Sequence, residues 1–188
     1  MELKEKIIKN REKFDKTSKT NDIFSESLVN FLGEDLFTAP ASNMESMYNS
    51  FPGGLIDHIL KVTKYAIYLN DSLPENIRVD KKSIIKVCFL HQIGKTFLYK
   101  FCESEWHRNN LGKMYDFNED LISMKIGERS AYYALSNGVE LSEEEYQSII
   151  NYDKSEEDKQ SKWYGSTLST LLRQANELSI IECKKISK

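Results

Sequence analysis

Helical periodicity is the feature of this sequence that most restricts its fold. Apolar residues recur three or four positions apart, the spacing that places them on one face of an α-helix. Seven segments have this pattern: 2–16, 22–32, 55–69, 80–99, 125–136, 142–152 and 164–183. Residues 106–117 instead alternate in character around an Asn-Asn-Leu-Gly turn, which predicts a small β-hairpin. We therefore expect a mainly α fold of about six to seven helices with one small β-hairpin.

Length and composition favour one domain. The chain has 188 residues, of which 40% are hydrophobic, and this is enough for a single core. Composition does not shift along the chain, and no internal repeat or low-complexity tract divides it. We predict a single helical domain over residues 1–188.

Charge and cysteine usage restrict the partners and the compartment. Lys and Arg number 26 against 29 Asp and Glu, a net charge of -3, which argues against affinity for nucleic-acid phosphates. Cys88, Cys102 and Cys183 are an odd number without CxxC spacing, a pattern typical of reduced cytosolic thiols. No apolar run is long enough for a signal peptide or a membrane span. We expect a cytoplasmic protein with no direct nucleic-acid or membrane binding.

Two histidines are predicted to lie inside the fold. His58 is one helical turn from both Leu55 and Val62, so it shares their inward face. His91 lies near the end of the most apolar helical segment. A buried imidazole needs a hydrogen-bond partner or a metal ion. Helical domains that hydrolyse phosphate esters use such histidines, with aspartates, to bind a metal ion. These residues lie on neighbouring helices because several ligands must converge on one cation.

The motifs around these histidines resemble those of the HD phosphohydrolase superfamily, and in particular a set of phage HD-domain proteins. GGLIDH ends at His58 and HQIGK begins at His91. TAPAS (38–42), IGERSAYY (126–133) and LSEEE (141–145) occur in the order found in those phage proteins, over nearly the whole chain. The resemblance implies an HD-like helical domain with a divalent-metal position between its central helices.

The positions that match the metal ligands of that family are largely replaced. They are Gln92 and Asn176 in place of aspartates, and Ile126, Tyr152 and Tyr48 in place of histidines, whereas His58 and His91 are retained. An amide is a poor substitute for a carboxylate that balances the charge of a dication. Since one lost supporting partner costs about 10- to 100-fold in affinity or activity, the loss of four of these ligands, without Tyr48, already implies more than roughly 10,000-fold. The resemblance therefore implies a pseudoenzyme with no catalytic residues, metal or cofactor.

Two other interpretations of the same residues stay open. Asp57, Glu128 and Asp153 lie near the replaced positions, so a rebuilt metal site is one alternative, although a shift of one residue rotates a helical side chain by about 100°. The other is a pseudoenzyme that holds a nucleotide through Lys95 and Arg129. We prefer His58 and His91 as buried imidazoles, hydrogen-bonded to Gln92, Asn176 or backbone carbonyls.

The resemblance and the size together imply a phage protein that binds a host protein. The partner that we expect is the RNA polymerase sigma factor, with inhibition or redirection of host transcription as the result. The alternative is a metal-dependent phosphohydrolase that acts on a nucleotide or nucleic acid. Trp106, Arg108 and Tyr115 are candidate binding residues, because aromatic and Arg side chains dominate contact energies. Alternatively, Trp106 and Phe117 pack the hairpin onto the body.

Overall fold

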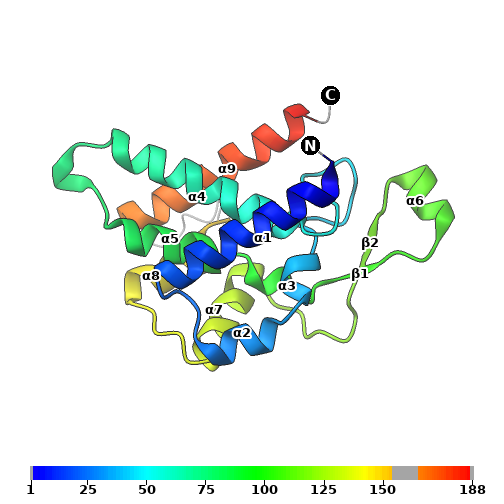
Figure 1. Ribbon diagram of the computed structural model, residues 1–188, viewed down its shortest axis with the longest axis horizontal. Coiled ribbons are helices and arrows are strands. Elements are labelled where there is room, and N and C mark those ends of the chain that lie inside the picture. The colour runs from blue at the N-terminus through cyan, green and yellow to red at the C-terminus, as the bar shows by residue number, and fades with distance from the viewer. Residues whose placement is uncertain (1, 154–164, 187–188) are drawn as a thin grey trace.

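The computed structural model describes residues 2–153 and 165–186. Within them the chain is mainly helical with one two-stranded antiparallel sheet, which confirms the expected fold class (Figure 1). The α-helices are α1 (Leu3–Thr20), α2 (Glu26–Leu32), α3 (Asp35–Thr38), α4 (Gly54–Ser72), α5 (Lys81–Leu90), α6 (Glu105–Leu111), α7 (Ile126–Ser136), α8 (Glu143–Asn151) and α9 (Thr167–Ile186). The remaining elements are the 3-10 turns η1 (Glu75–Ile77) and η2 (Ile93–Lys95) and the strands β1 (Tyr99–Phe101) and β2 (Tyr115–Phe117). The start expected for the last helix, residue 164, lies outside the described residues.

Two helices, α3 and α6, lie outside the seven segments with helical periodicity. Helix α6 occupies much of the stretch expected to form a hairpin, so that prediction is wrong in its position. Ser104 begins the helix because its Oγ accepts the N–H of His107 at 3.3 Å. Gly112 ends it with a φ of 61°, which glycine adopts without strain. The Asn-Asn-Leu-Gly stretch is therefore a helix end, and the paired strands flank it.

Strands β1 and β2 and helix α6 form an arm, residues 99–117, that projects from the helical body (Figure 1). Lys100 pairs with Asp116 at the centre of the strand register. A loop of the body lies against the arm, because Met44 forms an isolated β-bridge with Lys113 and the N–H of Glu45 donates to a carbonyl of the arm. These backbone contacts fix the arm to the body at a second place besides its two strands.

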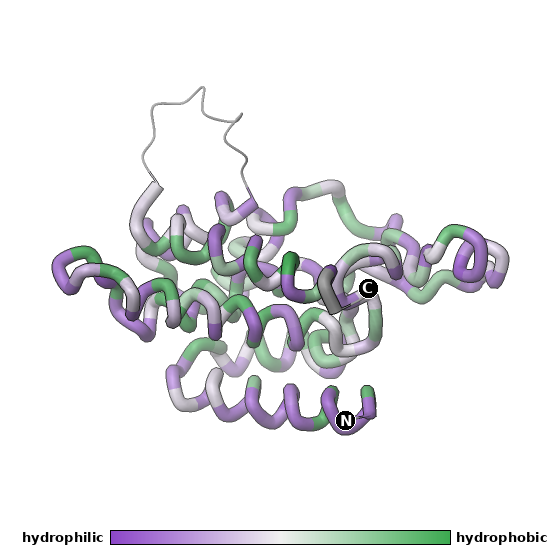
Figure 2. The backbone as a smooth tube through the Cα atoms, turned by 90° about the horizontal axis from the view of Figure 1, so that it is seen from above, coloured by the Kyte–Doolittle hydropathy of each residue, from purple (hydrophilic) through white to green (hydrophobic). Residues whose placement is uncertain are grey.

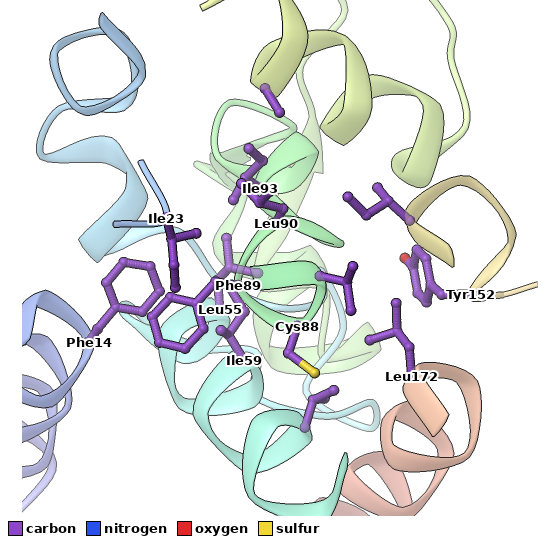
Figure 3. Close-up of a cluster of buried hydrophobic side chains, with 14 of the residues drawn as sticks. Phe14, Ile23, Leu55, Ile59, Cys88, Phe89, Leu90, Ile93, Tyr152 and Leu172 are labelled. Atoms are coloured by element: carbon purple, nitrogen blue, oxygen red, sulfur yellow. The ribbon is translucent and has the colours of Figure 1, made fainter. Parts of the chain in front are cut away.

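The core lies between α4, α5 and α9, and α1 covers it from one side. Helix α4 packs against α9, α5 and α1. Phe14 of α1 stacks on Phe89 of α5 with ring centroids 4.5 Å apart, and Tyr152 lies on the opposite side of the same cluster (Figure 3). Helix α1 is hydrophilic with apolar positions at intervals, as its place at the edge requires (Figure 2). None of the helices in the described ranges is long and apolar enough to cross a membrane.

A buried carboxylate fastens α1 to α4. Asp57 is 4% exposed and lies 2.9 Å from Nζ of Lys6 and 3.3 Å from Nζ of Lys61. The side-chain amides of Asn10 and Asn49 also donate to it. Burial raises the pKa of Asp57, but the two ammonium groups and the Asn10 amide lower it by more, so the net pKa lies below the usual range. The charged carboxylate of Asp57 therefore stabilises the packing of α1 on α4.

We predict that Phe14→Ala lowers the free energy of unfolding by about 3–5 kcal/mol, because it removes an aromatic ring from a closed cluster. The matched control is Ile8→Ala in the same helix, where 60% of the side chain is exposed and the loss should stay below about 1 kcal/mol. Urea unfolding followed by circular dichroism measures both. Similar losses in the two variants would show that α1 is not packed through Phe14.

Candidate functional site

The structure brings most of the replaced metal-binding positions to one place in the core. Helix α4 supplies His58, the end of α5 supplies His91 and Gln92, and α9 supplies Asn176. The rings of His58 and His91 lie 6.1 Å apart, and Asn176 Oδ1 is 2.9 Å from His58 Nε2 and 3.3 Å from Gln92 Nε2. All four residues are at least 93% buried. We call this group, with Lys95 and the tyrosines that contact it, the polar centre.

Two tyrosines close the polar centre. Tyr48, from the loop before α4, packs on His58 with ring centroids 4.7 Å apart. Tyr152, which follows α8, meets His91 edge-on at 4.9 Å. Burial raises the pKa of Tyr48 to about 12 and that of Tyr152 well above its usual value, so both phenols keep their protons. They serve as hydrogen-bonding and packing groups.

Both ring nitrogens of His58 are engaged. The hydrogen bond with Asn176, expected from the sequence, is present at Nε2, and Ser179 Oγ lies 3.0 Å from Nδ1. Because Asn176 Oδ1 accepts, Nε2 carries the hydrogen and Nδ1 accepts from the Ser179 hydroxyl. Burial, with smaller contributions from Lys95 and His91, holds the pKa of His58 well below its usual value. This neutral imidazole links α4 to α9.

His91 is engaged on one side only. Its Nδ1 donates to the backbone carbonyl of Cys88 at 2.7 Å, so Nε2 carries a lone pair. Nε2 has no hydrogen-bond partner among the described residues, and the same holds for Gln92 Oε1 and Asn151 Oδ1. Burial lowers the pKa of His91 to about 3, so this imidazole is neutral too.

Lys95 places a buried ammonium group at the polar centre. The residue is 3% exposed, and its Nζ donates to the Ala41 carbonyl at 2.7 Å and to the Tyr48 hydroxyl at 2.9 Å. Burial lowers the pKa of Lys95 to about 7. Its charge also contributes to the lowered pKa of both His58 and His91. Because this pKa is close to neutrality, Lys95 is only partly protonated near pH 7, and a second cation placed between these rings would meet its charge or displace its proton.

Ile126 lies beside this group at the start of α7 and supplies only backbone and packing. A side chain at Gly94, in the HQIGK motif, would approach the Ile126 carbonyl to 2.8 Å. The glycine is therefore required where η2 crosses the start of α7. The residues proposed for a rebuilt metal site do not converge, since Asp57 binds Lys6 and Lys61 and Glu128 faces solvent. Asp153 is exposed too, although its charge reaches the polar centre and opposes the lowering of the Lys95 pKa.

Within the described ranges, no three His, Cys, Asp or Glu side chains are grouped so that they can hold a metal ion. The two cations considered for nucleotide phosphates are engaged by backbone carbonyls, Lys95 by Ala41 and Arg129 by Ile122. What the polar centre offers chemically is a set of neutral hydrogen-bonding groups around one buried ammonium.

The candidate binding residues of the arm differ in exposure. Trp106 is 61% exposed, whereas Tyr115 is 7% exposed and does not belong to an accessible patch. Tyr115 is covered because its N–H bonds the carbonyl of Asn43, and the body loop lies against this end of the strand. Arg108 stacks over the Phe101 ring and bonds the Cys102 carbonyl. These contacts hold its guanidinium within the arm.

The alternative, in which Trp106 and Phe117 pack the arm onto the body, is wrong, because both side chains are exposed. Phe117 is 58% exposed, as is Phe101, which the sequence reading missed. Ser104, a residue type that commonly caps helices, is the sequence signal that could have predicted these exposed aromatic residues. A helix over residues 105–111 leaves only short strands on either side of it, so the arm extends away from the body.

Comparison with protein-family models, with curated proteins and with solved structures gives no match. The resemblance to phage HD-domain proteins therefore stays a prediction that rests on the motifs of the sequence.

We predict that acid destabilises the protein through His58 and His91. Their pKa values are lowered in the folded state, to about 3 for His91, so below about pH 6.5 the unfolded chain binds protons that the folded chain does not. The free energy of unfolding should fall with decreasing pH by about 1.4 kcal/mol per pH unit for each such histidine. His91→Gln should make this slope shallower between about pH 6.5 and 4, as measured by urea unfolding. Equal slopes in the two proteins would contradict the burial of a neutral His91.

Proposed function

We propose that this chain is a non-catalytic phage protein that binds a host protein, with the RNA polymerase sigma factor as its partner. The observation that carries the non-catalytic part is the engagement of His58. Both of its ring nitrogens bond neutral side chains of α9, so it has no lone pair directed at a metal. Metal binding would have to break this connection between α4 and α9.

The charge of the polar centre supports the same proposal. Hard divalent cations require carboxylate or other anionic ligands, which balance their charge. Here the neighbours of the two imidazoles are the amides Gln92 and Asn176 and the ammonium group of Lys95. Such surroundings favour packing over metal-assisted hydrolysis.

The exposed apolar residues of the arm support the proposed protein binding. Phe101, Trp106, Leu111 and Phe117 of the arm are 51–61% exposed. Large apolar side chains that gather on a projecting element are typical of protein-binding surfaces, and aromatic residues contribute most to binding energy. The arm is therefore the first region to which we assign partner binding.

The sigma factor is proposed from the resemblance to phage HD-domain proteins and from charge. The chain carries a net charge of -3. A protein of this sign suits a basic, DNA-contacting region of a polymerase subunit, since complementary charge speeds association and suppresses wrong partners. Occupation of that region would block or reroute its contacts with promoter DNA.

One observation favours the second candidate function, a metal-dependent phosphohydrolase acting on a nucleotide or nucleic acid. The lone pair of His91 Nε2 is unpartnered among the described residues, and imidazole nitrogen is a common ligand of transition metals. A hydrolase would need this lone pair together with ligands brought from elsewhere.

We predict that the purified chain binds the purified primary sigma factor of its bacterial host with a Kd below about 1 µM and alters transcription from sigma-dependent promoters. Biolayer interferometry and in vitro transcription measure the two effects. His91→Ala, if folded, should keep both, because the polar centre touches no partner. If the chain binds neither the free sigma factor nor the holoenzyme, the sigma factor is not its partner. Mn²⁺-dependent phosphodiester cleavage that is lost in His91→Ala would replace the proposal with the second candidate.

A further inference from the structure

A hollow of about 550 Å³ lies where the arm joins the body. Apolar side chains dominate its lining, among them Leu98, Tyr99, Phe117, Ile122 and Met124. Its volume is within the range of pockets that receive ligands or side chains of a partner. It is continuous with the exposed aromatic residues of the arm through Phe117, which is 58% exposed.

The lining is both exposed and held in place. Ile122 is 81% exposed, an unusual degree for an aliphatic side chain. The loop that carries it is fixed at each end, because the N–H of Asn118 donates to the Leu98 carbonyl at 2.9 Å and Arg129 donates to the Ile122 carbonyl at 2.5 Å. A preformed hollow binds with little ordering cost.

Around the hollow and the arm, most basic side chains form ion pairs, whereas several acidic side chains do not. Lys100, Lys113 and Arg108 pair with arm or loop carboxylates, at Asp120, Asp116 and Glu105. Among the described residues, Glu103, Glu119 and Asp153 are exposed without an ion pair, and so is Lys125. Arg129 also lines the hollow without an ion pair, but it is 6% exposed and bonds the Ile122 carbonyl. The exposed unpaired charge of these described residues is therefore negative.

The short strands limit the form of the partner. Each strand of the arm has three residues, too few for a stable added strand. A hollow beside a row of exposed aromatic residues suits an amphipathic helix instead, with one large apolar side chain inserted and its flanking residues over the arm.

We infer that this hollow binds an amphipathic helix of another protein, with an apolar anchor in the hollow and Lys or Arg side chains paired to Glu119 and Asp153. The inference rests on the proposed function, since it names the chemistry of the bound partner segment. A second copy of this chain is a poorer occupant. Its basic helix α1 exposes Leu3 and Ile8, which are five positions apart and point about 140° away from each other.

The test uses three fluorescein-labelled peptides of about 18 residues. One is an amphipathic Leu/Lys helix, one has Glu in place of every Lys, and one has the Leu/Lys composition in scrambled order. Fluorescence anisotropy should give a Kd of about 10 µM for the first and at least roughly 10-fold weaker binding for the other two. Binding should weaken between about 0.05 and 0.5 M salt. Equal binding of the Lys and Glu peptides, or of the scrambled peptide, overturns the inference.

Two matched pairs of variants locate the site. Ile122→Asp should weaken Leu/Lys binding by about 10-fold or more, and Ile181→Asp, on the exposed face of α9, should not. Glu119→Lys should weaken it by about 3- to 10-fold, and Glu140→Lys, in the loop after α7, should not. Equal effects within either pair overturn the inference, as does self-association of the wild type that Ile122→Asp abolishes, because the occupant would then be a second copy.

The sigma factor separates this inference from the proposed function. Equal binding of the sigma factor to wild type and Ile122→Asp would overturn the hollow as the partner site and leave the proposed function standing. Peptide binding with the expected variant effects, without sigma-factor binding, would support the hollow and overturn that partner.

Discussion

The fold depends on the hydrogen bonds that let polar side chains lie buried between α4, α5 and α9. His58 has no exposed surface, and its two bonds to Asn176 and Ser179 cross from α4 to α9 at the middle of the core. A buried polar group without a partner costs about 1–3 kcal/mol, so these bonds define which faces of the two helices meet. The surrounding apolar residues supply the larger burial energy but are less selective about helix register.

Lys95 is the costliest member of this arrangement. An ammonium group transferred from water to a protein interior loses several kcal/mol unless partners compensate. Its hydrogen-bond partners are the Ala41 carbonyl and the Tyr48 phenol, neither of which is charged, and the charge of Asp153 offsets only part of the effect of burial. The price appears in its pKa, lowered to about 7, and in the lowered pKa of both neighbouring histidines. Burial thus acts on all three groups in the same direction: it keeps both imidazoles neutral and leaves Lys95 only partly protonated near pH 7.

Local sequence pattern predicted the helices and the inward direction of His58 and His91, because both follow from the 3.6-residue period. The local pattern did not predict the features that depend on tertiary contacts. The same alternation fits a hairpin and a capped helix, and the Ser104 cap selected the helix α6. One alternative made Lys95 available for phosphate, yet the residue is buried and donates to the Ala41 carbonyl and the Tyr48 hydroxyl. The bond between Asp57 and Lys6 joins residues 51 positions apart, which no local pattern encodes.

Under the proposed function, the polar centre would act on partner binding through its mechanical connection to the arm. Lys95 holds the Ala41 carbonyl and the Tyr48 hydroxyl, the two ends of one loop. Between them, the Asn43 carbonyl accepts the N–H of Tyr115 in the arm. The buried ammonium therefore fixes the loop on which the arm rests. Under the proposed function, Lys95 and its neighbours would keep the arm rigid, and a preorganised surface binds with less loss of entropy.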